Sequence, residues 1–178
     1  MRLKIKINRN SKGSDNLSRL SDEILALLIR NAVHETRNSL FYATLNNHLS
    51  VKGFKNSANF CAKQIEEEQS HFKKVWDYIQ KRNAHAILSP IPEVIGDYSD
   101  LVFAFRSALN LEYQTTEIWQ EVYDKAKDTS DGITLLLAEK FLKIQESEET
   151  EFMAINDELA LIGNDALYQK LWDNTYEF

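Results

Sequence analysis

Residues 65–72 read Ile-Glu-Glu-Glu-Gln-Ser-His-Phe and contain Glu68 and His71, three residues apart. Two residues at this spacing are neighbours on one face of a helix. The pair lies midway along a stripe of mostly apolar residues that repeats at the helical period from Phe54 to Ile79. Glu-x-x-His is a weak signal by itself, so its meaning depends on what the other helical segments place at the same depth.

Three other segments share this design, being apolar at both ends and polar in the middle. They span residues 25–49, 101–122 and 134–159. The polar residues near their centres are Glu35, Glu112, Gln145 and Glu148. Helices of similar length that pack side by side bring such residues to one depth. Because buried carboxylates are costly unless they are paired or bound to metal, the pattern predicts a pair of metal ions in the core.

The few turn-forming residues predict four long helices joined by two short turns and one long connection. Only five glycines and two prolines occur, which suits a few long helices better than many short strands. The turns at Gly53 and Gly132 are short, so each predicts an antiparallel helical hairpin. Residues 81–98 contain both prolines; at ~3.3 Å per extended residue they can span a helix that rises ~1.5 Å per residue. We therefore expect an all-α four-helix bundle with a long crossover and a short fifth helix over about residues 165–174.

The composition excludes several classes of protein. The chain has 178 residues and suits one domain with a substantial core. Its net charge of -6 disfavours nucleic-acid binding by the bundle and favours cations. The single cysteine, Cys61, excludes a disulfide framework and a cysteine-rich zinc or rubredoxin site. No apolar run is long enough to span a bilayer, and the N-terminus lacks an apolar signal core, so a cytoplasmic location is the default expectation.

Residues 1–20 differ from residues 21–178, which we assign to the bundle and its C-terminal helix. In this N-terminal extension Leu3, Ile5 and Ile7 alternate with basic residues, and a polar stretch follows. This composition favours a mobile tail. A short strand that pairs with a neighbouring subunit is an alternative, and a basic arm that binds nucleic acid or a partner is less favoured.

The predicted cluster has the ligand chemistry of a two-metal site. Carboxylate-rich sites with one or two imidazoles suit iron, manganese or zinc. Glu68 is placed to bridge two ions. His71 and Glu35 could ligate one ion, and Glu112 and Glu148 could ligate the other.

Two further residues lie close to these ligands in the pattern. Gln145 is neutral and a poor ligand, so it would hydrogen-bond a bound water or oxygen, or ligate weakly. Tyr42 lies two turns after Glu35 and could orient a carboxylate or donate an electron. Taken singly, a helical glutamate is usually solvated, His71 would be an interfacial histidine, and Tyr42 a core residue. The coincidence in four helices is what favours a metal site.

Several motifs together resemble one known family. They are His34–Tyr42, Glu67–His71, Ala108–Glu112, Gln145–Glu148 and Leu161–Tyr168. In these motifs, in their order and in the long crossover, residues 21–174 resemble the non-haem ferritins of the bacterial type. Bacterioferritins and ribonucleotide reductase relatives have a second Glu-x-x-His where this chain has Gln145 and Glu148. Met1 and Met153 are the only methionines, so no haem is expected.

The resemblance implies a ferroxidase, which binds two Fe(II) ions and oxidises them with O2 or H2O2. It also implies a homo-oligomer, a hollow cage of twenty-four subunits that stores ferric oxyhydroxide. By position, the family's metal and catalytic residues correspond to Glu35, Glu68 and His71 (site A), to Glu68, Glu112 and Glu148 (site B), and to the nearby Gln145 and Tyr42.

The chain departs from the family pattern in three places. The third iron site of bacterial ferritins would use Glu67, but Ile144 and Ser147 occupy its other positions, so we expect that site to be absent or altered. The N-terminal extension is longer than usual. The last helix is short, which puts the contacts around the fourfold axis in doubt.

Two alternatives and one surface feature stay open. The bundle also fits a small di-iron peroxide-scavenging protein, although the usual rubredoxin cysteines are missing, or a non-catalytic shell or interaction subunit. Asp124, Asp128 and Asp131 line a threefold iron pore by analogy with ferritins, or they form a solvated acidic turn.

Overall fold

The computed structural model describes residues 17–94 and 100–178 and confirms the expected all-α class. Within these ranges the chain forms helices and no strand. The helices are α1 (Asp22–Lys52), α2 (Lys55–Lys81), α3 (Leu101–Asp128), α4 (Gly132–Ile162) and α5 (Ala166–Thr175). Residues 1–16 of the extension expected to be a mobile tail lie outside the described residues. Arg19 and Leu20 already contact the bundle, since the Arg19 amide donates to the Arg82 carbonyl and Leu20 is buried.

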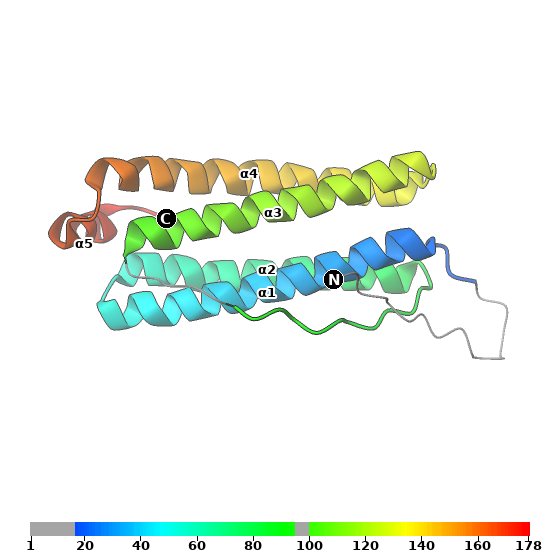
Figure 1. Ribbon diagram of the computed structural model, residues 1–178, viewed down its shortest axis with the longest axis horizontal. Helices are drawn as coiled ribbons and strands as arrows, with labels where there is room; N and C mark the ends of the chain where they lie inside the picture. Colours follow the sequence, from blue (N-terminus) through cyan, green and yellow to red (C-terminus); the bar gives the residue numbers. More distant parts are fainter. Residues whose placement is uncertain (1–16, 95–99) are drawn as a thin grey trace.

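Four long helices lie side by side, as Figure 1 shows. α1 packs antiparallel to α2, and α3 packs antiparallel to α4, while α1 also contacts α3. The connection between α2 and α3 runs back along the bundle, so these two helices are parallel (Figure 1). The crossover expected from the length of this connection is therefore confirmed. None of the described helices combines the length and apolar character needed to cross a membrane.

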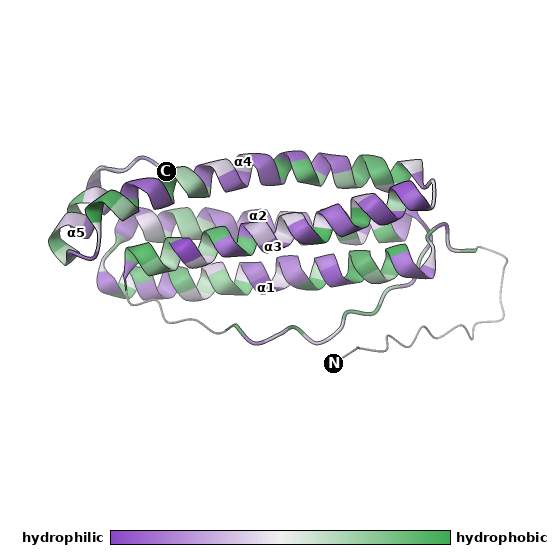
Figure 2. Cartoon of the chain, turned by 45° about the horizontal axis from the view of Figure 1, so that its top comes forward, coloured by the Kyte–Doolittle hydropathy of each residue, from purple (hydrophilic) through white to green (hydrophobic). Residues whose placement is uncertain are grey.

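The core is divided into two apolar clusters by a polar layer. Each helix presents both hydrophobic and hydrophilic faces (Figure 2). One cluster surrounds Phe105 and Phe152 near the α5 end, and the other surrounds Leu28 and Trp119 at the opposite end. The buried polar residues Glu35, Glu68, Glu112 and Gln145 belong to neither cluster. The sequence pattern of apolar ends and polar centres therefore becomes a layered core.

Side chains near in sequence cap three of the four long helices. Ser21 accepts a hydrogen bond from the Ile24 amide at the start of α1 (3.2 Å), and Asp100 and Asp131 do the same for α3 and α4. At Gly53 the backbone is left-handed (φ 80°), which ends α1 at little steric cost.

The remaining long helix, α2, is capped by a side chain that is distant in sequence. Its N-cap residue, Phe54, has an apolar side chain that cannot accept a hydrogen bond. Instead Asp173 of α5 accepts from the amide and hydroxyl of Ser57, at 2.8 and 2.6 Å. The C-terminal Phe178 stacks on Phe60 at 4.7 Å between ring centroids, so α5 and the tail close this end of the bundle.

Candidate metal centre

Three buried ligands from two helices meet in the polar layer. Glu35 comes from α1, and Glu68 and His71 come from successive turns of α2. One ligand atom from each residue lies within 4.8 Å of the other two, and this is the one such group within the described parts of the chain. His71 Nδ1 lies 3.8 Å from Glu35 Oε2, and its Nε2 lies 3.8 Å from Glu148 Oε1. His71 therefore faces carboxylates on both sides.

The second half of the layer comes from α3 and α4. Glu112 is buried and Glu148 is partly buried; both lie outside the three-residue group. Tyr42 donates a 2.5 Å hydrogen bond to Glu112 Oε1. Gln145 donates a short hydrogen bond to Glu148 Oε2. Six of the seven residues singled out in the sequence thus lie in the polar layer, and Tyr42, which belongs to the apolar cluster near α5, reaches it through its hydroxyl.

The hydrogen bonds of this layer are incomplete. One oxygen each of Glu35, Glu68 and Glu112 is buried and has no hydrogen-bond partner among the described residues. An unpaired buried carboxylate oxygen is costly, and most buried polar groups in proteins are satisfied. A cation is the missing partner that would satisfy several such oxygens together, so the donor set fits a metal.

Burial also opposes the ionisation of these carboxyls. It raises the pKa of Glu35 and Glu68, and the neighbouring carboxyls of Glu35 and Glu112 raise that of Glu68 further. Burial, with the neighbouring carboxylates, raises the pKa of Glu112 and of Glu148 to about 8. The metal-free layer therefore holds protons at neutral pH that cations would displace.

The imidazole has the opposite tendency. Burial lowers the pKa of His71 to about 4 because the charged form is poorly solvated. A neutral imidazole has a free lone pair, which is the form that ligates a metal. At neutral pH His71 is therefore ready to bind a cation without first losing a proton.

Sequence reasoning missed four residues that contact the ligands or their partners. Thr116 and Glu149 form a short hydrogen bond, and the Thr116 hydroxyl lies 3.5 Å from Gln145 Oε1. Asn31 and Trp119 form a hydrogen-bonded pair beside Glu35. Trp119 lay on the expected apolar stripe, but the position of its N–H could not be read from periodicity.

A groove between α2 and α4 reaches the layer from outside. It has a volume of about 810 Å³, and His71 and Glu148 are part of its wall. Lys74, Lys140 and Lys143 also line it, together with Glu67, Glu139 and Glu151. Ile144 and Ser147 stand here as well, so the groove presents fewer carboxylates than a third iron site on these positions would require.

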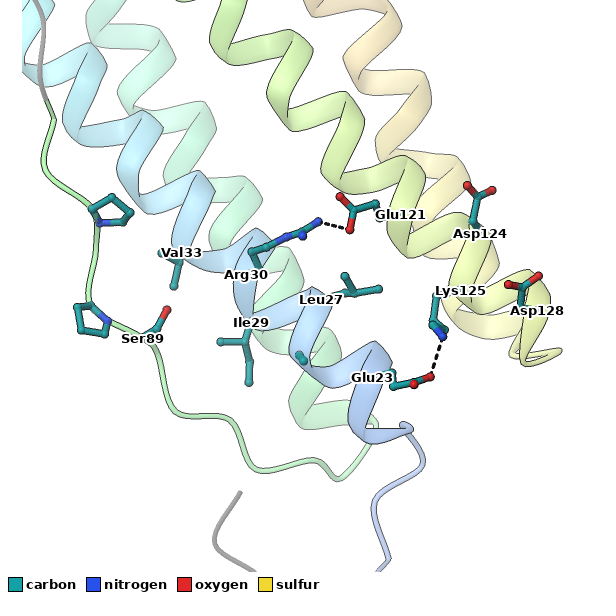
Figure 3. Close-up of a pocket in the computed structure, with 13 residues that line it drawn as sticks. Glu23, Leu27, Ile29, Arg30, Val33, Ser89, Glu121, Asp124, Lys125 and Asp128 are labelled. Atoms are coloured by element: carbon teal, nitrogen blue, oxygen red, sulfur yellow. Dashed lines mark ion pairs between the residues drawn. The ribbon is translucent and has the colours of Figure 1, made fainter. Parts of the chain in front are cut away.

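A second groove, of about 950 Å³, lies over α1 between the crossover and α3 (Figure 3). Its floor is apolar, and the ion pairs Glu23–Lys125 and Arg30–Glu121, both 2.7 Å, cross it. None of the candidate metal ligands lines this groove, so it is separate from the centre.

The three acidic residues near the α3–α4 turn, Asp124, Asp128 and Asp131, do not act as one group in the subunit. Asp124 and Asp128 line the second groove (Figure 3). Asp131 instead caps α4, accepting from the Thr134 hydroxyl at 2.7 Å, and pairs with Arg82 at 3.3 Å. A structural role therefore accounts for Asp131.

The fold and the carboxylate-rich layer together define a ferritin-like four-helix-bundle protein. The family model for the ferritin-like domain matches residues 25–162, so the chain belongs to the ferritin family. The resemblance seen in the sequence motifs is thereby confirmed.

Relatives and a solved structure agree with this assignment. The chain is 31% identical over 155 residues to the bacterial non-heme ferritin of Staphylococcus epidermidis, covering 85% of this chain and 93% of the relative. It is 28% identical over the same length to that of Staphylococcus aureus. The open pore ferritin of the archaeon Archaeoglobus fulgidus superposes with a TM-score of 0.82 at 21% identity, over 90% of this chain and 100% of that one, which shows the shared fold.

Proposed function

We propose that this protein is an iron-storage ferritin with ferroxidase activity. It binds two Fe(II) ions in the polar layer, oxidises them with O2 or H2O2, and stores the ferric product as oxyhydroxide inside a cage. The observation that carries the proposal is the set of unpartnered, buried carboxylate oxygens on three helices of a ferritin-family bundle. The substrate ions supply the missing partners.

Each predicted residue then has a role that its surroundings support. Glu35 and His71 hold one ion, Glu112 and Glu148 hold the other, and Glu68 lies between them as the bridging carboxylate. Tyr42 and Gln145 hold one oxygen of Glu112 and of Glu148 respectively through the hydrogen bonds they donate. Hydrogen bonds of this kind orient ligands and leave the second oxygen for the cation.

Proton release accompanies iron binding in this scheme. The carboxyls with raised pKa give up protons when the ions bind, because only the ionised form is a good ligand. The groove between α2 and α4 provides a route to the outside for ions and protons, since His71 and Glu148 form part of its wall.

Exposed apolar side chains support a homo-oligomer, which we propose to be a cage of twenty-four subunits in the cytoplasm. Monomeric proteins rarely expose large contiguous apolar patches. The exposed apolar residues on the crossover and near α5 are Ile87, Leu88, Ile91, Leu161, Leu167 and Leu171. The similarity to bacterial non-heme ferritins favours the same assembly here.

The proposal is tested by stopped-flow oxidation of Fe(II) by O2, titrated per chain, on protein sized by analytical ultracentrifugation. We expect a fast phase that saturates near two irons per chain on a large assembly that then takes up much more iron. Glu35→Ala and His71→Ala should lose the fast phase and keep the assembly. Fast oxidation by a small oligomer without further uptake would favour the peroxide scavenger, and no fast phase would favour a non-catalytic subunit.

A further inference from the structure

Asn31 and Trp119 form a hydrogen-bonded chain that ends on a candidate metal ligand. Asn31 lies one turn before Glu35 on α1, and Trp119 lies on α3; both are fully buried. The Trp119 indole N–H donates to the side-chain oxygen of Asn31 at 3.0 Å, and the amide of Asn31 donates to Glu35 Oε1 at 3.2 Å. The Trp119 ring is itself held by stacking on Phe141 at 4.0 Å.

The direction of this chain is set by chemistry. An indole N–H can only donate, so the group of Asn31 that faces it must be the carbonyl oxygen. The NH2 group of Asn31 then points at Glu35. An ionised carboxylate has no proton to donate, so it serves only as an acceptor. The tryptophan thereby determines which end of the asparagine amide meets the glutamate.

The same chain distinguishes the two oxygens of Glu35. Oε1 is occupied by the Asn31 amide, whereas Oε2 has no hydrogen-bond partner among the residues described and lies 3.8 Å from His71 Nδ1. Without Asn31, rotation of the carboxylate would no longer be restrained in this way. The free oxygen is therefore held toward the imidazole, where a shared cation would lie.

We infer that Asn31 and Trp119 are positioning residues that orient Glu35 for metal binding. This inference rests on the proposed function, since it assigns a role at the same site. Asn31 acts directly on Glu35, and Trp119 acts by orienting the Asn31 amide and through its own N–H, which also influences the Glu35 carboxyl. Neither residue is a ligand, and neither is needed to fill the coordination of an ion.

A purely structural role and a positioning role predict different metal affinities, and two substitutions distinguish them. Asn31→Leu removes the amide and leaves the Trp119 N–H buried without its acceptor, which lowers stability. Trp119→Phe keeps an aromatic ring against Phe141 and removes the N–H. The double variant removes both polar partners, so much of the stability should return. A positioning role predicts that metal affinity does not return with it.

The experiment measures Co(II) binding to the metal-free, assembled protein by calorimetry and by visible absorption, without O2. Thermal unfolding of each metal-free variant is recorded in parallel. The matched controls are Asn156→Leu and Trp172→Phe. In the wild type the Asn156 amide donates to backbone carbonyls and the Trp172 indole donates to Glu158. These controls remove the same chemical groups away from the polar layer.

We expect Asn31→Leu to weaken Co(II) binding at one site by roughly tenfold to a hundredfold and to change its absorption bands. Trp119→Phe should weaken binding less, the double variant should bind as weakly as Asn31→Leu, and the controls should bind like the wild type. Wild-type affinity in Asn31→Leu, or affinity that recovers with stability in the double variant, would overturn the positioning role alone. If Glu35→Ala binds Co(II) like the wild type, the proposed site itself is wrong and the positioning role falls with it.

Discussion

Among the described residues, buried carboxylates occur in two regions, and their surroundings differ. At the α5 end, Asp173 is fully buried and accepts from the Ser57 amide, the Ser57 hydroxyl and, at 3.4 Å, the Asn56 amide. In the polar layer, Glu35, Glu68 and Glu112 are equally buried, but each keeps an oxygen without a hydrogen-bond partner among the described residues.

This difference separates a structural carboxylate from a candidate ligand. Asp173 lies at the N-terminus of α2, where amides and the helix dipole favour negative charge. The polar layer instead concentrates acidic groups that disfavour one another's ionisation. Burial of a carboxylate is therefore not sufficient to indicate a metal site. The indication is a set of carboxylate oxygens that converge and lack hydrogen-bond partners.

The largest expected effect comes from removing a ligand of the polar layer. Glu68→Gln should slow the fast oxidation of Fe(II) by about a hundredfold or more, since even substitutions beside ligands cost ten- to a hundredfold. Stopped-flow kinetics measure the rate. The metal-free variant should be at least as stable as the wild type, because the neutral amide has the same charge and nearly the same shape as the protonated carboxyl that it replaces. A large loss of stability would show that Glu68 resembles Asp173 instead.

Removing the structural carboxylate should have the reverse outcome. Asp173→Ala should lower the free energy of unfolding by roughly 2–4 kcal/mol, because the start of α2 loses its cap and the Ser57 hydroxyl loses its acceptor. Urea unfolding measures the loss, and Asp173→Asn, which keeps the shape, should cost less. Affinity for Co(II) should be unchanged, and a weaker affinity would contradict the separation of the two regions.

The raised pKa values predict how the metal-free protein responds to pH. Between pH 6.5 and 8, Glu112 and Glu148 are ionised in the unfolded chain but still largely protonated when folded, since their pKa is raised to about 8. The folded state binds more protons, so stability should fall as pH rises, by roughly 2 kcal/mol per pH unit for the two groups together.

His71 does not oppose this trend in that window. Its pKa is lowered from 6.5 to about 4. Its contribution to the free energy of unfolding therefore rises with pH between about 4 and 6.5 and is constant above pH 6.5. Thermal unfolding of metal-free protein at pH 6.5 and pH 8 measures the slope, and Glu112→Gln should flatten it. A stability that rises over this interval would show that the carboxyls are ionised in the folded protein.

The smallest effect is expected at Tyr42. Tyr42→Phe removes the hydrogen bond to Glu112 and should lower the free energy of unfolding by about 1 kcal/mol. That hydrogen bond lowers the pKa of Glu112, so its loss should move Co(II) binding to higher pH. Calorimetric titrations at several pH values measure the shift. An unchanged pH dependence would mean that the Tyr42 hydroxyl does not influence this ligand.

Much of the fold was predictable because helical periodicity and helix caps are local properties. On α3 every residue at the helical spacing expected over residues 101–122 is buried; these are Leu101, Phe105, Ala108, Glu112, Thr115, Trp119 and Val122. On α2 the stripe was less accurate, since Ile65 and Phe72 are only partly buried. The cap on α2 could not be predicted, because Asp173 and Ser57 are 116 residues apart.

The helices, their order, the crossover and the set of polar residues at one depth all follow from the pattern of residues along the chain. Spacing along a helix is enough for this, since it assigns a residue to a face and to a height. The packing of the helices, by contrast, is needed to know which carboxylate oxygens have partners, and that Trp119 and Asn31 hold one oxygen of Glu35. Those pairings depend on how each helix is rotated against its neighbours and on the rotamer of each side chain, which periodicity leaves open.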